Sequence, residues 1–352
     1  MQIDLSLSLW FAKGLAFLRH VNISVAFVVS GFLLLVINLH AYAQEELRVR
    51  ANVIFGQIPE KMRGSENDTR EKVRLGERLY FEKALSINRT LSCNSCHNLL
   101  YGGAGVDNLK TSVGALGIVG RRNTPSTWNA GFQFAQNWDA SASTLAEQAR
   151  SPILDPSEMA LPSEKEAIKR LRKIGYKKQF KLAFPEQANA LNFENITLAL
   201  AAFQRTLVTK DRFDEFLNGD DKALTSEEKS GLELVLSQGC ISCHSGPLMG
   251  GRFVMEMGLV NPYANTEDKG RSEITGNEAQ DFFFKVPSLR NTAQTAPYFH
   301  DGEGENLEKA VFDTGWLQLG IKLTEKEVSE ISAFLRALDN TRPFKRQLTT
   351  VN

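Results

Sequence analysis

The four cysteines of this 352-residue chain occur in two copies of one pattern, C-x-x-C-H. The two copies are formed by Cys93, Cys96 and His97, and by Cys240, Cys243 and His244. This pattern is the attachment sequence for c-type haem, in which the thiols bind the macrocycle and the adjacent His binds the iron. A redox C-x-x-C pair or a structural zinc site uses the same residue types, but neither accounts for a His directly after both pairs. The sequence therefore predicts two covalently bound c-type haems.

The N-terminal segment has the composition of an export signal. Lys13 and Arg19 precede an apolar stretch at 21–39, and Ala41-Tyr42-Ala43 forms an A-x-A cleavage site before Gln44. We expect residues 1–43 to be a cleaved signal peptide. The alternative is an uncleaved membrane anchor, because the apolar stretch approaches the length that spans a bilayer.

Charge and composition exclude several other classes of protein. Lys and Arg number 41, as do Asp and Glu, so the formal net charge is zero. The chain therefore lacks the broad positive charge of a nucleic-acid-binding protein, and we expect no nucleic-acid partner. With 42% hydrophobic and 23% charged residues, the composition is that of an ordinary globular protein.

Helical patterns lie on both sides of each motif. Apolar residues predict a helix from Arg74 to Glu82 before the first motif, and a second helix, whose apolar face runs from Ile196 to Leu207, after it. The second motif lies between two capping boxes, each of which predicts the start of a helix. These boxes are formed by Thr225 with Glu228 and by Thr324 with Glu327.

A helix before the haem and another that closes over it is the plan of a class I cytochrome c domain. Strand signals are few and short. We therefore predict a mostly α fold with two class I cytochrome c-like haem domains in tandem, at residues 44–215 and 216–352. The polar run from Lys210 to Lys222 is predicted to be the linker between them.

Around these motifs, from about Gly76 to Leu338, the sequence resembles the bacterial di-haem cytochrome c peroxidase family, which includes the MauG-type enzymes. The resemblance is specific in residues 93–108, 123–159 and 285–310. It includes N-W-D at 137–139, L-A-E-Q-A at 145–149, K-V-P-S-L-R-N at 285–291 and T-A-P-Y-F-H-D-G at 295–302. The resemblance implies that the N-terminal haem reduces peroxide and that the C-terminal haem receives electrons from a small donor protein.

The resemblance also implies the residues of the peroxide site. Glu158 matches the family's acid/base carboxylate, which can relay a proton between the two peroxide oxygens as the O–O bond breaks. Gln148 would line the same pocket, and Pro152 would shape its wall. Trp138 matches the indole that lies between the two haems in the family, although a packed core aromatic is also a suitable interpretation.

A calcium ion at the domain interface is a further implication of the resemblance. Asn123 matches its side-chain ligand, while Thr295 and Pro297 match its carbonyl ligands, and oxygen-only ligation suits calcium. Three further residues of the matched segments are assigned to the surroundings of the haems: Met159, Arg290 and His300.

Ala115 departs from the family pattern, because many members have a distal His there that caps the resting N-terminal haem. After removal of residues 1–43, the histidines that remain are His97, His244 and His300. Two of them are the predicted proximal ligands, and His300 belongs to the domain of the other haem. We therefore expect the N-terminal haem of the oxidised protein to be open to peroxide.

Thr314 is a second departure, at the position where the peroxidases have a Met as sixth ligand of the C-terminal haem and MauG-type proteins a Tyr. A threonine hydroxyl is a poor iron ligand. Met249, Met255 and Met257 follow the second motif closely and are candidate replacements, as are Tyr298 and water. Because the axial ligand sets the haem potential, the potential of this haem stays open.

Three functions are compatible with these features. The first is a periplasmic di-haem cytochrome c peroxidase that reduces hydrogen peroxide to water with electrons from a small cytochrome c or cupredoxin; the oligomeric state stays open, and a homodimer is compatible. The second is a MauG-type enzyme that uses peroxide to oxidise residues of a protein substrate. The third is a di-haem electron carrier, but Gln148, Pro152 and Glu158 have no use in a carrier whose haems are both six-coordinate.

Overall fold

The computed structural model of the protein describes residues 44–100, 105–342 and 344–346. The predicted signal peptide or anchor at 1–43 lies outside the described residues. Within the described ranges, no helix combines the length and the apolar character that a membrane crossing requires. The chain divides into two compact units, residues 1–50 and 51–352, and both motifs belong to the second.

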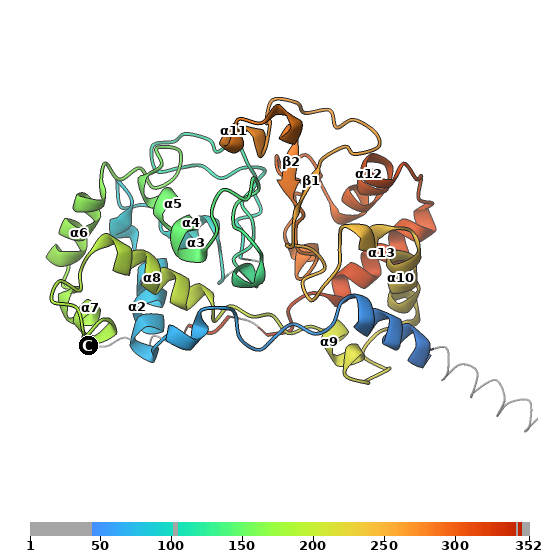
Figure 1. Cartoon of the computed structure of the whole chain (residues 1–352), viewed down its shortest axis with the longest axis horizontal. Coiled ribbons are helices and arrows are strands. Elements are labelled where there is room, and N and C mark those ends of the chain that lie inside the picture. The colour runs from blue at the N-terminus through green and yellow to red at the C-terminus, as the bar shows by residue number, and fades with distance from the viewer. Residues whose placement is uncertain (1–43, 101–104, 343, 347–352) are drawn as a thin grey trace, which may run out of the picture. The chain divides into compact units, whose positions relative to one another are not determined.

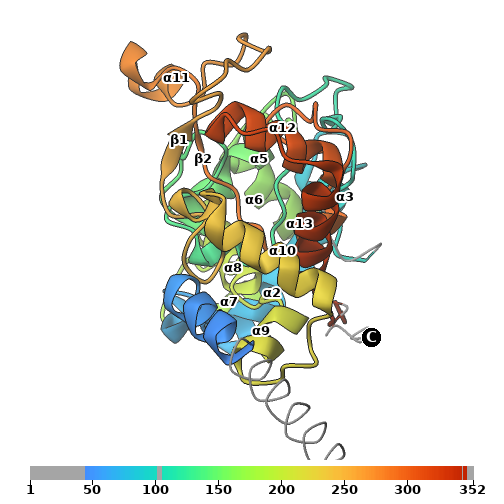
Figure 2. The ribbon, with the colours of Figure 1, turned by 90° about the vertical axis from the view of Figure 1, so that its right-hand side faces the viewer.

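Short helices and long connecting loops make up most of the second unit (Figures 1 and 2). In residues 70–217 the α-helices are α2 (Arg70–Tyr80), α3 (Cys93–Cys96), α4 (Leu145–Gln148), α5 (Arg150–Leu154), α6 (Glu164–Lys173), α7 (Lys177–Ala183), α8 (Phe193–Gln204) and α9 (Arg212–Leu217). They are followed by α10 (Ser226–Ser237), α11 (Ser272–Thr275), α12 (Leu307–Leu319) and α13 (Glu325–Ala337). The strands β1 (Val254–Glu256) and β2 (Phe283–Lys285) pair antiparallel, with Met255 opposite Phe284. The predicted mostly α fold is confirmed.

The predicted helices on either side of the first motif are present as α2 and α8, with shifted ends. α2 begins at Arg70, four residues before the predicted start, because the Thr69 side chain accepts a hydrogen bond from the Lys72 N–H and caps the helix there. α8 ends at Gln204, so Leu207 lies past the helix although it is buried.

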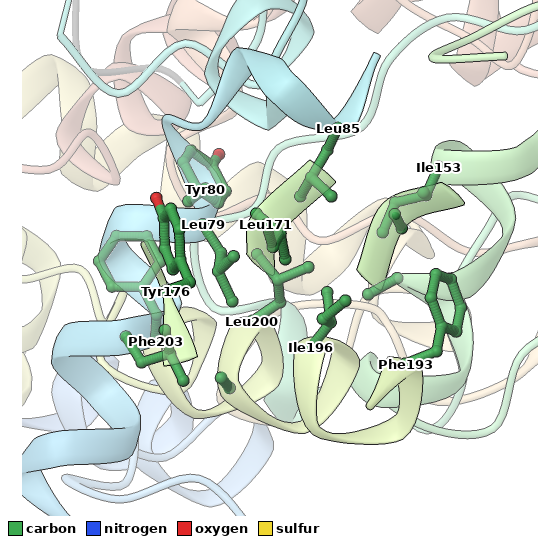
Figure 3. Packing of buried hydrophobic residues seen from close by; sticks show 14 of the residues in the cluster. Leu79, Tyr80, Leu85, Ile153, Leu171, Tyr176, Phe193, Ile196, Leu200 and Phe203 are labelled. Atoms are coloured by element: carbon green, nitrogen blue, oxygen red, sulfur yellow. The ribbon is translucent and has the colours of Figure 1, made fainter. Parts of the chain in front are cut away.

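Gly76 sets the distance between α2 and α8. A Cβ atom at this position would lie 1.9 Å from the Ala199 carbonyl oxygen and 2.8 Å from the Phe203 Cβ, so only glycine permits this approach. The Tyr80 and Phe203 rings then pack edge to face, with centroids 5.1 Å apart. Figure 3 shows further side chains of this core, including Leu79, Ile153, Leu171, Ile196 and Leu200.

Both predicted capping boxes begin helices that lie side by side, α10 and α13 (Figure 2). The Thr225 hydroxyl accepts a hydrogen bond from the Glu228 N–H, and the Glu228 carboxylate accepts one from the Thr225 N–H. Thr324 and Glu327 exchange the same pair of bonds at the start of α13. The two boxes are confirmed.

Gly231 has the same role in the second helix pair, α10 and α13, as Gly76 has in the first pair, α2 and α8. Its hypothetical Cβ would lie 1.9 Å from the Glu330 carbonyl oxygen and 2.9 Å from the Phe334 Cβ. In both pairs a glycine of the helix before the motif therefore faces a backbone carbonyl and a Phe of the helix after it. This repetition is consistent with two haem domains of one plan in tandem.

The predicted linker from Lys210 to Lys222 is partly wrong, because α9 forms within it. The Asp211 carboxylate caps α9 by accepting a hydrogen bond from the Asp214 N–H, and both Phe213 and Phe216 are fully buried. The polar composition of this run predicted a loop and not a helix. Polar residues such as Asp211 are nevertheless buried here, because they have hydrogen-bond partners inside the protein. The predicted domain boundary at 215 and 216 falls inside α9 and stays a prediction.

Candidate active site

The first C-x-x-C-H motif forms α3 and the residue after it. Burial raises the pKa of Cys93 to about 12 and also raises that of Cys96, and neither cysteine forms a disulfide. The Tyr80 hydroxyl donates a hydrogen bond of 2.6 Å to the His97 carbonyl. His97 Nδ1 lies 2.9 Å from the Pro125 carbonyl oxygen, which fixes the ring and leaves Nε2 as the nitrogen that can bind a metal.

The second motif holds its imidazole in the same way. His244 Nδ1 lies 2.8 Å from the Met249 carbonyl oxygen. Burial lowers the pKa of both His97 and His244, which favours the neutral imidazole that binds metals. A cavity of about 290 Å³ lies beside Cys240, Cys243 and His244, with mainly apolar walls from α10, α12, α13 and β2.

His300 lies on the wall of this cavity and is 2% exposed. Its ring stacks on Phe284 with centroids 4.0 Å apart, and its Nε2 has no hydrogen-bond partner among the described residues. Buried polar atoms are normally hydrogen-bonded, so an unpaired nitrogen at a cavity wall fits a bound group that interacts with it. Cysteine pairs outside disulfides, oriented imidazoles and this cavity together fit a haem cofactor.

Glu158 lies near the first motif and is exposed to solvent. Desolvation by the surrounding protein is the main cause that raises the pKa of Glu158 to about 7, and the negative charge of the neighbouring Asp155 carboxylate adds to it. Burial is the main cause of the raised pKa of Cys93 and Cys96, and the negative charge of Glu158 is a smaller one. This carboxylate therefore lies near the two thiols. The structure therefore brings together residues more than sixty positions apart.

The turn after α5 holds Glu158 in place. The Met159 N–H donates to the Pro152 carbonyl, and the Glu158 N–H donates to the Asp155 carbonyl, each at 3.0 Å. Met159 is 5% exposed and belongs to the apolar core of this half. Gln148 is the last residue of α4, directly before α5, and is partly buried like Pro152.

Ala115 lies directly against the Glu158 turn. Its N–H donates a hydrogen bond of 2.6 Å to the Glu158 carbonyl, and the Asn88 side chain donates to the Ala115 carbonyl at 2.6 Å. A Cβ at Gly114 would lie 2.2 Å from the Ser157 carbonyl oxygen, so the two backbones are in close contact. The Ala115 methyl group offers no atom that could bind iron.

Trp138 connects segments from both halves of the unit. Its Nε1–H donates a hydrogen bond of 2.9 Å to the Asn123 carbonyl, and its own carbonyl accepts one of 2.6 Å from the Lys285 N–H. The Asn123 N–H in turn donates to the His300 carbonyl at 2.7 Å. Trp138 and Asn123 both line the cavity beside the second motif.

The predicted calcium ligand Asn123 lines the cavity beside the second motif. Asn123 Nδ2 donates to the Leu109 and Lys110 carbonyls at 3.1 and 3.2 Å, bonds that do not involve the Oδ1 atom a cation would bind. Thr295 and Pro297 line the same cavity. In the part of the chain that the structure describes, no group of three or more His, Cys, Asp or Glu side chains is arranged to hold a metal ion.

Arg290 lies on the cavity wall, but its charge already has anionic partners. Its Nη1 lies 2.7 and 2.6 Å from the two Asp211 carboxylate oxygens, and its Nη2 lies 3.1 Å from Asp214 Oδ1. Its Nε donates to the Pro247 carbonyl. The Arg290 side chain therefore joins α9 to the loop after the second motif.

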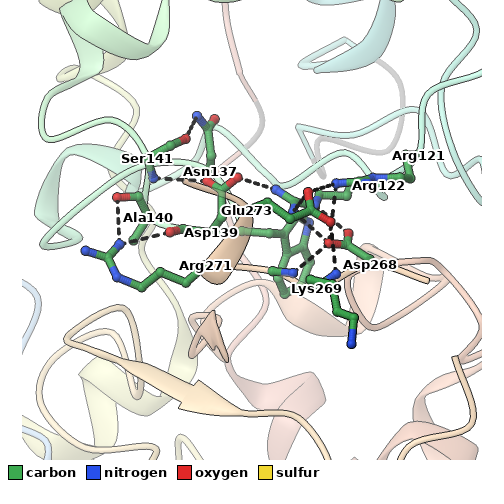
Figure 4. A network of polar contacts seen from close by, with 12 residues as sticks. Arg121, Arg122, Asn137, Asp139, Ala140, Ser141, Asp268, Lys269, Arg271 and Glu273 are labelled. Carbon is green, nitrogen blue, oxygen red and sulfur yellow. Dashed lines mark hydrogen bonds and ion pairs between the residues drawn. The ribbon is translucent and has the colours of Figure 1, made fainter. Parts of the chain in front are cut away.

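Arg122 is the centre of a polar network that no sequence motif predicted (Figure 4). Arg122 Nε and Nη2 donate to the two Asp268 carboxylate oxygens at 2.6 and 2.8 Å, and Nη1 donates to Asp139. Asp139 directly follows Trp138, so this network fixes the segment of the indole to residues after the second motif. In the sequence, only the place of Asp139 in the matched N-W-D motif pointed to a role for this carboxylate.

Comparison with known proteins identifies the family. A sequence profile described as "Di-haem cytochrome c peroxidase" matches residues 70–222. The cytochrome c551 peroxidase of Pseudomonas aeruginosa is 40% identical over 309 residues, which cover 85% of this chain and 88% of that protein. The chain belongs to the di-haem cytochrome c peroxidase family. The resemblance stated from the motifs is confirmed, and the family carries two haems.

MauG-type members of the family are also related to this chain. The methylamine utilization protein MauG of Methylorubrum extorquens is 34% identical over 285 residues, which cover 77% of this chain and 78% of that protein. The crystal structure of a MauG-like protein associated with microbial copper homeostasis matches with a TM-score of 0.72 and 30% identity, over 81% of this chain and 94% of that one. The match confirms the tandem fold. The higher identity to the peroxidase favours a haem peroxidase, an oxidoreductase.

Proposed function

We propose that this protein reduces hydrogen peroxide to water beside its first motif, with electrons from a small redox protein, a cytochrome c or a cupredoxin. The observation that carries the proposal is the Glu158 carboxyl. It is exposed to solvent near the thiols of Cys93 and Cys96, and its pKa is raised to about 7. A carboxyl with a pKa near the working pH is suited to both accept and return a proton.

The two motifs would hold the cofactors covalently. Cys93 and Cys96 would form thioethers with the N-terminal haem, and His97 Nε2 would bind its iron. The matching residues of the C-terminal haem are Cys240, Cys243 and His244. When bound, the haems would supply the redox chemistry, with peroxide reduction at the first motif and electron entry at the second.

The residues of the chain would then direct the proton. The Glu158 carboxylate takes a proton from one peroxide oxygen and returns it to the other, which leaves as water. The turn bonded through Pro152 and Met159 holds this carboxylate, and Gln148 would line the same peroxide site. Ala115 leaves room for peroxide where many family members have a capping imidazole.

Trp138 would lie between the two haems and shorten the path of the electrons. Its hydrogen bond to Asn123, and the bond from Asn123 to His300, support a fixed position for the ring. We propose that Asn123, Thr295 and Pro297 hold a calcium ion in the same region, since amide and carbonyl oxygens suit that ion. Arg290 and His300 would complete the surroundings of the C-terminal haem.

We assign the protein to the periplasm, with residues 1–43 as a cleaved signal peptide. The support is the order of features in this segment: basic residues come first, an apolar stretch follows, and an A-x-A cleavage site ends it. The haem domains are assigned to 44–215 and 216–352, and a homodimer is compatible with the assignment.

A MauG-type activity is the second candidate, because Thr314 replaces the Met ligand of the peroxidases and because a MauG-like protein shares the fold at 30% identity. The test is stopped-flow mixing of purified di-haem protein with peroxide and a reduced small cytochrome c or cupredoxin. A peroxidase oxidises two donor molecules for each peroxide, since water formation takes two electrons. Peroxide consumption without donor oxidation would favour the MauG-type activity, and the absence of consumption would leave an electron carrier.

A further inference from the structure

The sixth ligand of the C-terminal haem is the open question at the second motif, and the inference below rests on the proposed function. Thr314 lies on the face of α12 that lines the cavity, together with Ala310, Val311 and Gln318. Its hydroxyl is a poor ligand for iron. A replacement ligand must reach the cavity next to this face of α12.

Two of the candidates are engaged elsewhere. Met249 is fully buried, does not line the cavity, and presents its carbonyl to His244 Nδ1, so it orients the proximal imidazole. Tyr298 lines the cavity, but its hydroxyl donates to the Thr292 carbonyl at 3.2 Å. Neither side chain is placed to bind the iron opposite His244.

The β1 strand directs two methionines toward the cavity. Met255 lies in β1 opposite Phe284 of β2, and Met257 follows the strand with its N–H donating to the Phe282 carbonyl at 2.9 Å. Both methionines line the cavity.

Met257 is the methionine that contacts α12. Its Sδ lies 3.5 Å from Gln318 Nε2. Gln318 is four residues after Thr314, so the two lie one above the other on the same helix face. The Met257 thioether therefore lies beside the position from which the family supplies its own methionine.

We propose that Met257 Sδ is the sixth ligand of the C-terminal haem iron and replaces the methionine absent at Thr314. A thioether sulfur has two lone pairs. One would bind the iron while the other accepts the hydrogen bond from Gln318, which is thereby a positioning residue. Methionine ligation raises the potential of a c-type haem, which suits the haem that receives electrons.

His300 is the competing ligand, because its Nε2 is buried and unpaired at the same cavity. The ring is stacked on Phe284 and packs edge to face against Tyr263, with centroids 4.0 and 5.6 Å away. These contacts fix the imidazole on the wall of β2, whereas Met257 contacts the helix that carries the matched position. The experiment distinguishes the two ligands.

The test is spectroscopic and uses the purified di-haem protein. Wild-type ferric protein is expected to show the long-wavelength charge-transfer band of methionine–iron ligation, and Met257→Leu is expected to lose the band and to lower the midpoint potential of the C-terminal haem. Met255→Leu is the matched control and should retain both. Gln318→Leu should shift the band without abolishing it. Met257→His should give a bis-imidazole low-spin signal instead, which shows that position 257 reaches the iron.

Three results would overturn the proposal: no methionine band in the wild type, a band that survives Met257→Leu, or a band that is lost in Met255→Leu instead. A low-spin bis-imidazole signal in the wild type that His300→Gln removes would assign the ligand to His300. Haem content by the pyridine haemochrome assay verifies that each variant folds and holds two haems. Because these readouts need no peroxide, they are independent of the test of the proposed peroxidase activity.

Discussion

At the scale of single residues, the proposed chemistry depends on a few side chains in two short motifs and on one carboxyl. Glu158 combines accessibility with a pKa raised to about 7. We expect Glu158→Gln to preserve both haems and the fold while it slows peroxide turnover by about 10²-fold or more, because the amide keeps the shape but cannot relay a proton. Steady-state kinetics measures this loss. Glu164→Gln, on the surface of α6, is the control, and equal rates in both variants would show that Glu158 is an ordinary loop residue.

The same carboxyl predicts a pH dependence. The raised pKa means that Glu158 is mostly protonated below about pH 7 and mostly ionised above it. Since the ionised form accepts the proton from peroxide, kcat/KM for peroxide should rise with pH through about 7 and then level off. Glu158→Gln should lack this rise. A rise of the same shape in the variant would assign the titration to another group.

The cysteines of each motif predict the haem content. Replacing Cys93 and Cys96 together with Ser should leave one covalently bound haem per chain, because the second motif is separate from the first. The measurement is haem that resists acid–acetone extraction, per mole of protein. Replacing Cys240 and Cys243 is the matched variant, and retention of two resistant haems in either case contradicts the assignment.

Ala115 predicts the resting state of the N-terminal haem. Its methyl group cannot bind iron, so the oxidised protein should contain a high-spin ferric component and react with peroxide without prior reduction. Ala115→His places an imidazole beside the Glu158 turn, with which residue 115 shares a hydrogen bond of 2.6 Å. Electron paramagnetic resonance should then show conversion to low-spin iron. Only low-spin haems in the wild type would reveal another blocking ligand.

At the scale of elements, each motif lies between two helices whose spacing is set by one glycine. Gly231→Ala should destabilise the second helix pair by about 1–3 kcal/mol, because the new Cβ would lie 1.9 Å from the Glu330 carbonyl oxygen and force α10 from α13. Chemical denaturation followed by circular dichroism measures the change. At Gly120 the nearest atom to a new Cβ, the Ser112 carbonyl oxygen, is 3.3 Å away, so Gly120→Ala should cost much less. Equal losses of unfolding free energy in the two variants would show that the close contact between α10 and α13 does not restrict the residue at position 231.

At the scale of the whole molecule, the Arg122 network joins the Trp138 segment to the residues after the second motif. Arg122→Leu should lower the free energy of unfolding by about 3–5 kcal/mol, because it removes the arginine paired with the buried Asp139 carboxylate and leaves the buried Asp268 carboxylate only its longer contact with Arg121. Denaturant titration measures the loss. Arg121 is half exposed and pairs with Asp268 and Glu273. Arg121→Leu should therefore lower the free energy of unfolding by no more than about 1 kcal/mol. A small effect at Arg122 would mean that water replaces the lost partner.

The sequence by itself determined the features that depend on neighbours within a few residues. The C-x-x-C-H motifs and the capping boxes of Thr225 and Thr324 are of this kind, because helix geometry fixes how residues three or four apart meet. Departures such as Ala115 and Thr314 were also visible in the residue types alone. They indicated which ligand is missing at each haem, but not which residue binds the C-terminal haem instead.

Tertiary structure decided the contacts between residues far apart in the chain. The approach of Glu158 to Cys93, the pairing of Arg122 with Asp268 and the position of Met257 beside Gln318 all depend on how the loops fold back between helices. The same holds for α9, whose capping Asp211 pairs with Arg290 from a distant segment. No local periodicity encodes such contacts, because they follow from the packing of complete elements against one another.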